Sequence, residues 1–367
     1  MLRLAAFVSP HGFGHAARTA AILEALGERL PELEVDLWTS VPPWFFGESL
    51  TVPWRYRELV CDVGLVQKSP VEEDLAASLA ALDRRWRLEG AKDRLAEVAS
   101  ELVADGCHAV LCDIAPLGLA VARVAGLPSI LVENFTWDWI YEPLVAAEPG
   151  FAPWIERMRS CFALADLHLQ LEPVCRPTAD AIPIPPVARR SHSTPAWVRR
   201  RLGIDEGRTM ILVSLGGIAH RLDRLARLAD REECVFVLPG AAEEERWERN
   251  LRLLPHHSPV HHPDLVAAAD VVAGKLGYST VAESLAAGAC LLYVPRPGFR
   301  ESATLEAYVR DRLPARAIGW AELQTGEWTE RLPELRALPR PPAATSRGAA
   351  LAAERIAAWL AGGGGRV

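Results

Sequence analysis

Lysine is nearly missing from this sequence: only Lys68, Lys92 and Lys275 stand against 37 arginines. No uncharged apolar stretch of 18 residues occurs, so no transmembrane helix is predicted, and the apolar run before Pro10 is too short for a secretory leader. Runs of five like charges are absent and the formal net charge is -7, so neither nucleic acid nor an anionic membrane is an expected partner. The seven cysteines form no CxxC pair, and we predict reduced thiols in a cytoplasmic protein.

The residues that are present predict a folded protein with two domains. Half of the 367 residues are apolar and 24% are charged, which allows a sizeable buried core. Short apolar strands alternate with amphipathic helices, the pattern of a parallel sheet wound by crossover helices. The predicted strands are 2–9, 34–40, 108–114, 129–135, 209–217, 234–240, a short one near Val260, 270–274 and 290–295, and the predicted helices are 17–30, 117–125, 263–269, 279–288 and 301–313.

A proline-rich segment interrupts this alternation. Six prolines fall between Glu172 and Pro195, and we predict a linker there that continues neither helices nor sheet ladders. The predicted domains are therefore residues 1–186 and 187–340. A last helix at 346–361 follows a second proline run and is expected to pack back on the first domain.

The loop after the first predicted strand, Ser9-Pro-His-Gly-Phe-Gly-His-Ala-Ala-Arg18, is the first candidate site, because ligands of open α/β sheets bind beyond the carboxyl ends of the strands. Gly12 and Gly14 let a ligand approach the backbone closely, and His15 opens the next helix. Arg18 opposes the helix dipole, so we expect it to have an anionic partner. In the structural alternative, Arg18 pairs with a buried carboxylate and His15 only caps the helix.

Asp113 ends another predicted strand at the same sheet edge. A carboxylate there accepts a hydrogen bond from an imidazole, fixes its tautomer and stabilises its protonated form. Asp113 is therefore a candidate partner for a catalytic histidine. The alternative is that Asp113 caps the helix that follows.

Two glycine turns mark the second domain. Gly216 and Gly217 follow its first strand and expose backbone N–H groups that suit a pyrophosphate. Farther on, the N–H groups at Ser279 and Thr280 open a helix and favour an anion at its start. Lys275 precedes this turn, where a compact ammonium could reach a phosphate oxygen; a solvated side chain is the alternative.

Glu283 has two interpretations that its spacing does not separate. Thr280-x-x-Glu283 matches a capping box, in which the glutamate returns to the backbone. In the other interpretation, the carboxylate accepts hydrogen bonds from the hydroxyls of a ribose.

Two further clusters are less specific. Four of the ten histidines lie between His256 and His262, but adjacent histidines on an extended loop point apart. No metal site is therefore predicted, and one of these histidines near a nucleobase is the functional alternative. Trp137, Trp139 and Tyr141 form either a platform for an acceptor or part of the core.

Together, HGFGHAAR, ENFTWDWIY and GKLGYSTVAESLA resemble the GT-B glycosyltransferases, most closely the glycosyltransferase-like half of the plant arabinokinases. The resemblance spans residues 3–310. It implies the α/β GT-B fold, in which two doubly wound Rossmann-like domains face each other across a cleft. The first domain then binds the acceptor and the second binds a nucleotide diphosphate sugar, with a UDP-sugar expected and no other cofactor or metal.

The resemblance also implies roles for single residues. His15 falls where inverting members place the base, Asp113 where several place its carboxylate partner, and Glu283 where the ribose is held. Inverting relatives often have an acidic residue followed by Gln after the last strand, for which Glu301 is a substitute here. The candidate donor-binding residues are Gly216, Gly217, Lys275, Gly277, Ser279, Thr280, Glu283 and Glu301, and the candidate acceptor or cleft residues are His11, Gly12, Gly14, Arg18, Asn134 and Trp137.

We therefore predict a cytoplasmic glycosyltransferase that moves a sugar from a nucleotide diphosphate sugar to a small acceptor hydroxyl with inversion, His15 being the base. The kinase half of the arabinokinases, with its glycine-serine ATP loop, is absent from the sequence, so sugar phosphorylation is not predicted. Two alternatives stay open: a nucleotide-sugar epimerase or hydrolase of the same fold, and a non-catalytic sensor that binds a sugar nucleotide. The sequence predicts no oligomeric state.

Overall fold

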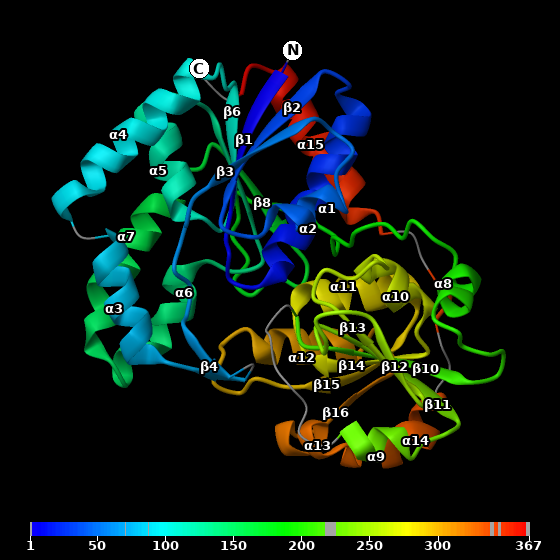
Figure 1. Ribbon diagram of the computed structural model, residues 1–367. Helices are drawn as coiled ribbons and strands as arrows, with labels where there is room; N and C mark the ends of the chain where they lie inside the picture. Colours follow the sequence, from blue (N-terminus) through cyan, green and yellow to red (C-terminus); the bar gives the residue numbers. More distant parts are fainter. Residues whose placement is uncertain are drawn as a thin grey trace. The chain divides into compact units, whose positions relative to one another are not determined.

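The computed structural model describes residues 2–69, 71–86, 88–216, 225–337, 341–343 and 346–364. The chain divides into two compact units, which Figure 1 colours along the sequence. The first unit contains Met1–Lys68, Glu73–Val187 and Arg347–Val367, and the second contains Ser69–Glu72 and Ala188–Ser346. The short segment 69–72 falls within the first predicted domain, yet it groups with the second unit because Val71 packs against the core of that unit.

The sheet of the first unit consists of β1 (Leu2–Val8), β2 (Leu33–Thr39), β3 (Trp54–Glu58), β6 (Ala109–Asp113), β7 (Ser129–Glu133), β8 (Leu167–Leu171) and β9 (Ile182–Ile184). These strands are parallel and lie in the order β3-β2-β1-β6-β7-β8-β9. The direction of winding reverses between β1 and β6. Such a reversal is where open α/β sheets bind ligands.

Two helices from opposite ends of the chain cover one face of this sheet. α1 (Phe13–Arg29) packs against α15 (Gly348–Ala361), and Figure 1 shows the red C-terminal helix beside the blue α1. The small side chains of α15 share one apolar core with α1 and with the strands. The other helices of the unit are α2 (Pro43–Gly47), α3 (Leu75–Trp86), α4 (Leu88–Ala104), α5 (Pro116–Ala125), α6 (Trp137–Tyr141) and α7 (Ala152–Phe162), with 3-10 turns at Glu142–Ala146 and Pro149–Phe151.

The sheet of the second unit consists of β10 (Thr209–Ser214), β11 (Cys234–Pro239), β12 (Arg246–Glu248), β13 (Leu251–Leu254), β14 (Val271–Lys275), β15 (Cys290–Val294) and β16 (Ala315–Ala317). The order is β12-β13-β11-β10-β14-β15-β16, parallel except for the β12-β13 pair. The winding reverses between β10 and β14, so this unit repeats the arrangement of the first.

Within the described residues of this unit, seven helices and one 3-10 turn accompany the second sheet. The sheet is buried between two apolar clusters, which contain alternate side chains of the same strands. The helices are α8 (Pro195–Arg201), α9 (Leu225–Ala229), α10 (His262–Ala268), α11 (Tyr278–Ala287), α12 (Ser302–Arg310), α13 (Trp320–Thr325) and α14 (Leu332–Arg336), with a 3-10 turn at Glu327–Arg331. A separate two-stranded ladder consists of β4 (Gln67–Ser69) and β5 (Glu72–Glu73), whose residues are divided between the two units.

Two predictions of local structure were wrong. The proline-rich segment does carry a strand, β9, which is tolerated because it lies at the edge of the sheet, where proline need not donate to a ladder. Val260 lies in a loop between Pro255 and α10, and the strand of this region is β13 instead. Within the described residues, none of the helices combines the length and apolarity needed to cross a membrane.

Candidate active site

Asp113 is the centre of the polar contacts at the winding reversal of the first unit. It ends β6 and is fully buried. His15 Nδ1 lies 2.8 Å from its Oδ1, and Arg18 Nε and Thr19 Oγ1 donate to its Oδ2 at 2.6 and 2.9 Å. Burial raises the pKa of Asp113, but the Arg18 and His15 side chains outweigh that effect and hold this pKa below its ordinary value. Asp113 is therefore an ionised carboxylate at neutral pH.

The backbone brings His15 to this carboxylate. Val8 and Asp113 are register partners at the ends of β1 and β6, so the loop after β1 starts beside Asp113. Gly12 takes a φ of 77°, which favours glycine, and turns the chain into α1. Gly12 is also the N-cap of α1, and Ala115 is the N-cap of α5. The capping alternatives for His15 and Asp113 are therefore wrong.

Arg18 takes the position that the structural alternative gave it. Its side chain is buried, and Nη2 lies 2.5 Å from Asp113 Oδ1 and 2.9 Å from His15 Nδ1. Nη1 donates to the side-chain oxygen of Asn134. Arg18 thus neutralises much of the negative charge that Asp113 presents to His15. In a His–Asp pair without such an arginine, the histidine would face the full charge of the carboxylate.

Asn134 and Trp137, two candidate acceptor residues, are held inside the unit. Asn134 Nδ2 donates to the carbonyl of Leu171 at 2.6 Å, and Trp137 Nε1 donates to Asp62 Oδ2 at 2.9 Å. Trp137 is fully buried, as is Tyr141. The core interpretation of the aromatic cluster is the one that the structure shows.

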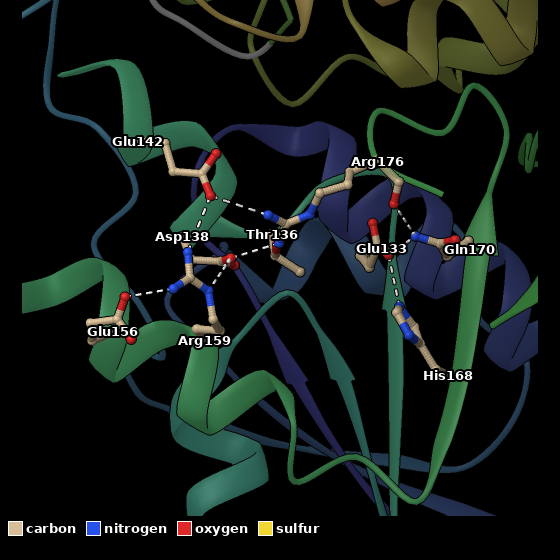
Figure 2. A network of polar contacts seen from close by, with 9 residues as sticks. All are labelled: Glu133, Thr136, Asp138, Glu142, Glu156, Arg159, His168, Gln170 and Arg176. Atoms are coloured by element: carbon tan, nitrogen blue, oxygen red, sulfur yellow. Dashed lines mark hydrogen bonds and ion pairs between the residues drawn. The ribbon is translucent and has the colours of Figure 1, made fainter. Parts of the chain in front are cut away.

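A second polar network fixes the segment that follows β7 (Figure 2). Arg176 donates to Asp138 Oδ2 at 2.6 Å and to Glu142 Oε1 at 3.2 Å, so the loop after β8 holds α6. At the end of β7, the buried Glu133 accepts hydrogen bonds at 2.7 Å from two side chains of β8, His168 and Gln170. These contacts fix Glu133, which directly precedes Asn134, and Asp138, which directly follows Trp137.

In the second unit, α11 begins at the predicted anion-binding turn. Its N-cap is Gly277, so Ser279 and Thr280 lie in its first turn, where backbone N–H groups have no acceptor within the helix. An anion at this position is stabilised by those N–H groups and by the helix dipole. Lys275 ends β14 directly before the turn.

Close packing of two strands shapes the same edge. A Cβ atom on Gly274 would lie 1.8 Å from the carbonyl oxygen of Ser214, so only glycine lets β14 and β10 approach in this way. Gly216 follows β10 with a φ of 69°. Gly217, the other glycine of this predicted phosphate turn, lies outside the described residues.

Glu283 is buried on α11 and is engaged through both carboxylate oxygens. Arg189 Nε donates to Oε1 at 3.1 Å, and His262 Nδ1 lies 3.0 Å from Oε2. His262 Nε2 in turn lies 3.1 Å from the hydroxyl of Ser214. Burial raises the pKa of Glu283, but Arg189 and His262 lower it more, to about 2. The capping box is therefore wrong, and the ribose contact stays a prediction that requires one of these partners to yield.

The remaining candidates have protein contacts of their own. Glu301 Oε1 lies 3.7 Å from Arg296 Nη1, and both side chains are buried. His261 stacks on His192 with ring centroids 4.4 Å apart, and burial with the nearby Arg189 lowers the pKa of His261 to about 3. Within the described part of the chain, no three His, Cys, Asp or Glu residues are grouped so that they could hold a metal ion.

Asp62, Arg189 and Ser214 are among the residues of these sites that were not found from the sequence. Asp62 lies in a short segment without a motif, and Arg189 is one of 37 arginines, so neither position carries a distinguishing pattern. Ser214 stands within a predicted glycine turn, where the reasoning used only backbone N–H groups. A search for polar residues at the ends of all predicted strands could have found Ser214.

Comparison with known proteins supports the fold. No protein-family model matches the chain. L-arabinokinase of Arabidopsis thaliana is 28% identical over 348 residues, which is 90% of this chain and 32% of that protein. The chain thus spans about a third of the length of this curated relative.

Solved glycosyltransferase structures match over almost the whole chain. The calicheamicin glycosyltransferase CalG4 aligns with a TM-score of 0.64 at 15% identity, covering 98% of both chains. The glycotransferase of kitacinnamycin aligns with a TM-score of 0.60 at 16% identity, covering 99% of this chain and 96% of the other. UGT2 of Phytolacca americana, solved with UDP-2-fluoro-glucose and pterostilbene, aligns with a TM-score of 0.60 at 12% identity over 100% of both chains. With its two Rossmann-like units, each carrying a polar site at its winding reversal, the chain has the GT-B fold of these glycosyltransferases.

Proposed function

We propose that this protein is an inverting glycosyltransferase that moves a sugar from a nucleotide diphosphate sugar to a small acceptor hydroxyl. The contact between His15 Nδ1 and Asp113 at the winding reversal of the first unit carries the proposal. An imidazole held through Nδ1 has Nε2 as its base nitrogen. The proposal assigns the acceptor and the base to the first unit and the donor to the second.

In the proposed step, the acceptor oxygen attacks the anomeric carbon while its proton passes to Nε2 of His15. The bond from that carbon to the diphosphate oxygen breaks, and the nucleoside diphosphate leaves with the electron pair. Asp113 stabilises the imidazolium that forms, and the positive Arg18 beside the ring disfavours its protonation beforehand.

The start of α11 supports the donor half of the proposal. The N–H groups of its first turn and the helix dipole stabilise the negative charge that develops on the leaving diphosphate. Lys275 supplies a cation at the end of the neighbouring strand. A UDP-sugar is the proposed donor, and Glu283 is the proposed ribose acceptor once the partly exposed His262 releases Oε2.

A sugar-nucleotide-binding protein without transfer is the second candidate. The observation that favours it is the ion pair between Arg18 and Asp113, which leaves less of the carboxylate charge to stabilise a protonated His15. Both candidates predict donor binding by the second unit, so turnover separates them.

The experiment that tests the proposal compares binding with turnover. A thermal-shift screen with UDP-, GDP-, ADP- and dTDP-sugars finds the donor, because a ligand at 100 times its Kd stabilises the folded protein by about 2.7 kcal/mol. With that donor, His15→Ala is expected to lower turnover by ~10²- to 10⁴-fold and to leave donor affinity within twofold.

The exposed His108, directly before β6, provides the control, and His108→Ala is expected to keep full turnover. Donor binding without turnover in the parent protein would support the second candidate. Equal losses of binding and turnover in His15→Ala would give His15 a binding role.

A further inference from the structure

A buried carboxylate outside the proposed catalytic pair joins the loop after β1 to α6. Asp62 has a relative exposure of 1%. Its Oδ1 accepts a hydrogen bond from Ser9 Oγ at 3.0 Å, and its Oδ2 accepts one from Trp137 Nε1 at 2.9 Å. Ser9 Oγ also accepts the backbone N–H of His11 at 3.3 Å. Asp62 is thus one side chain away from the loop that leads to His15.

Gly64, two residues after Asp62, packs closely against the same loop. Gly64 has a φ of 60°, and a Cβ atom there would lie 2.7 Å from His11 Nδ1 and 2.9 Å from the Trp137 ring. The His11 and Trp137 rings meet edge to face with centroids 5.3 Å apart. The hydroxyl of Tyr141 donates to the carbonyl of Gly64 at 2.9 Å. Asp62 and Gly64 therefore lie against the first residues of the loop, at Ser9 and His11, and Asp113 contacts His15 farther along it.

We propose that Asp62 is a positioning residue, which keeps the His11–His15 loop in its working conformation through Ser9 and Trp137 and does so in its ionised form. The inference rests on the proposed transferase function, because it concerns the loop that carries the proposed base. Asp62 contacts neither of the proposed reacting groups and acts through its two hydrogen-bond donors.

The donors explain why ionisation matters. An indole N–H only donates, so Oδ2 facing Trp137 must stay unprotonated, and any proton on Asp62 resides on Oδ1. Ser9 must then turn its hydroxyl hydrogen away from Asp62 and accept instead of donating. Protonation of Asp62 therefore rearranges Ser9, which is the hydrogen-bond partner of the His11 backbone.

The groups around Asp62 bring its protonation close to neutral pH. Burial and the charge of Asp113 raise the pKa of Asp62 to about 7, against the lowering effect of its hydrogen bonds from Trp137 and Ser9. The other titratable groups nearby are Cys61, Tyr141 and the ring of His11. Burial raises the pKa of both Cys61 and Tyr141 well above neutrality, so these two groups stay uncharged while Asp62 titrates.

Asp62→Asn tests the proposal because the amide keeps the shape of the side chain and does not titrate. Its oxygen accepts the hydrogen bond from Trp137, and its NH2 group donates to Ser9 as a protonated carboxyl group would. The first readout is the indole N–H resonance of Trp137 in the ¹⁵N-tryptophan-labelled full chain, assigned with Trp137→Phe. We expect it to shift with a midpoint near pH 7 in the parent and to be independent of pH in Asp62→Asn. The second readout is turnover against pH, which is expected to rise through the same midpoint in the parent and to lose that limb in the variant.

Turnover of Asp62→Asn is expected to fall by up to about 100-fold, as for a small misplacement of a catalytic group, with donor affinity unchanged. Ser9→Ala is the second variant, since it keeps Asp62 but removes the link to His11. It is expected to keep the indole titration and to lose the pH-dependent limb of turnover. The control is Asp180→Asn, an exposed aspartate of the same unit, which is expected to match the parent in both readouts.

A Trp137 resonance in the parent that does not change with pH overturns the proposal, as does an Asp62→Asn variant with the pH profile of the parent. If no donor supports transfer while the indole titration persists, the proposed function fails and the coupling of Asp62 to Trp137 stands.

Discussion

At the scale of single residues, the charges around Asp113 decide what His15 can do. Asp113 serves both the imidazole and the buried guanidinium of Arg18. The Arg18–Asp113 pair is nearly neutral as a unit, so it orients the ring without strongly favouring its charged form. A base that has to be neutral before the reaction benefits from this balance.

The first residue-scale prediction concerns Asp113→Asn. This change removes the carboxylate that the buried Arg18 guanidinium contacts, and removing one member of a buried ion pair costs roughly 3–5 kcal/mol. We therefore expect a large loss in the free energy of unfolding by denaturant, in addition to a lower turnover. A variant that loses turnover but keeps the stability of the parent would show that Arg18 finds another counter-charge.

The second residue-scale prediction concerns Glu283→Gln. If Glu283 binds ribose hydroxyls, this variant is expected to weaken binding of ribonucleotide donors more than binding of their 2′-deoxy counterparts. Calorimetric titration with a matched ribo and deoxyribo pair measures the difference. Equal affinity changes for both donors would limit Glu283 to its contacts with Arg189 and His262.

At the scale of elements, the sequence predicts the helices and turns that follow from a local pattern of residues. It misses strands that depend on their place in the sheet. The glycine turn and the helix at 279–288 follow from spacing, and α11 begins one residue before the predicted start. β9 was missed because its prolines exclude an interior strand, whereas its place at the sheet edge becomes known only when the strand order is known.

The element-scale prediction uses the close approach of β14 and β10. In Gly274→Ala the added methyl group meets the Ser214 carbonyl oxygen at 1.8 Å, so the two strands must separate. We expect destabilisation of roughly 1–3 kcal/mol, as for other overpacked sites, together with weaker donor binding because Ser214 moves relative to His262. Thermal unfolding and donor titration measure the two effects.

Gly277→Ala is the matched control for Gly274→Ala. A Cβ atom on Gly277 has no neighbour within 4 Å, and its backbone is extended. This variant is expected to keep the stability of the parent, so any loss of donor affinity in it reports on the ligand alone. A Gly274→Ala variant as stable as Gly277→Ala would contradict the packing argument.

At the scale of the whole molecule, the two winding reversals explain which parts of the sites could be predicted from the sequence. Each predicted site follows the strands that flank a reversal, β1 and β6 in one unit and β10 and β14 in the other. The pattern of strands and helices therefore predicts which loops share a sheet edge. It does not predict which buried charges pair there, because the partners are far apart in the sequence. Arg18 and Asp113 are separated by 95 positions, and Arg189 and Glu283 by 94.

The last prediction concerns pH, because two buried carboxyl groups give the two units opposite responses to it. The pKa of Glu283 is lowered from 4.5 to about 2, so the folded second unit binds fewer protons than the unfolded chain in this window. Its stability falls as pH drops below 4.5, by up to about 3 kcal/mol. The pKa of Asp62 is raised from 3.8 to about 7, so the folded first unit binds more protons than the unfolded chain. Its stability falls as pH rises from 4 to 7, by up to about 4 kcal/mol.

Calorimetry between pH 3 and 8 is therefore expected to resolve two transitions that move in opposite directions with pH. In Asp62→Asn the first unit is expected to lose its dependence between pH 4 and 7. In Glu283→Gln the second unit is expected to lose the contribution of Glu283 below pH 4.5 and to keep the rise of stability between pH 3 and 6.5 that the lowered pKa of His261 produces. A first unit whose stability rises steadily from pH 4 to 7 would contradict the assignment for Asp62, since a buried carboxyl group with a raised pKa produces the opposite slope. The same result would also remove the basis for an ionisation of Asp62 near neutral pH, so this measurement tests the loop-positioning role without any assay of transfer.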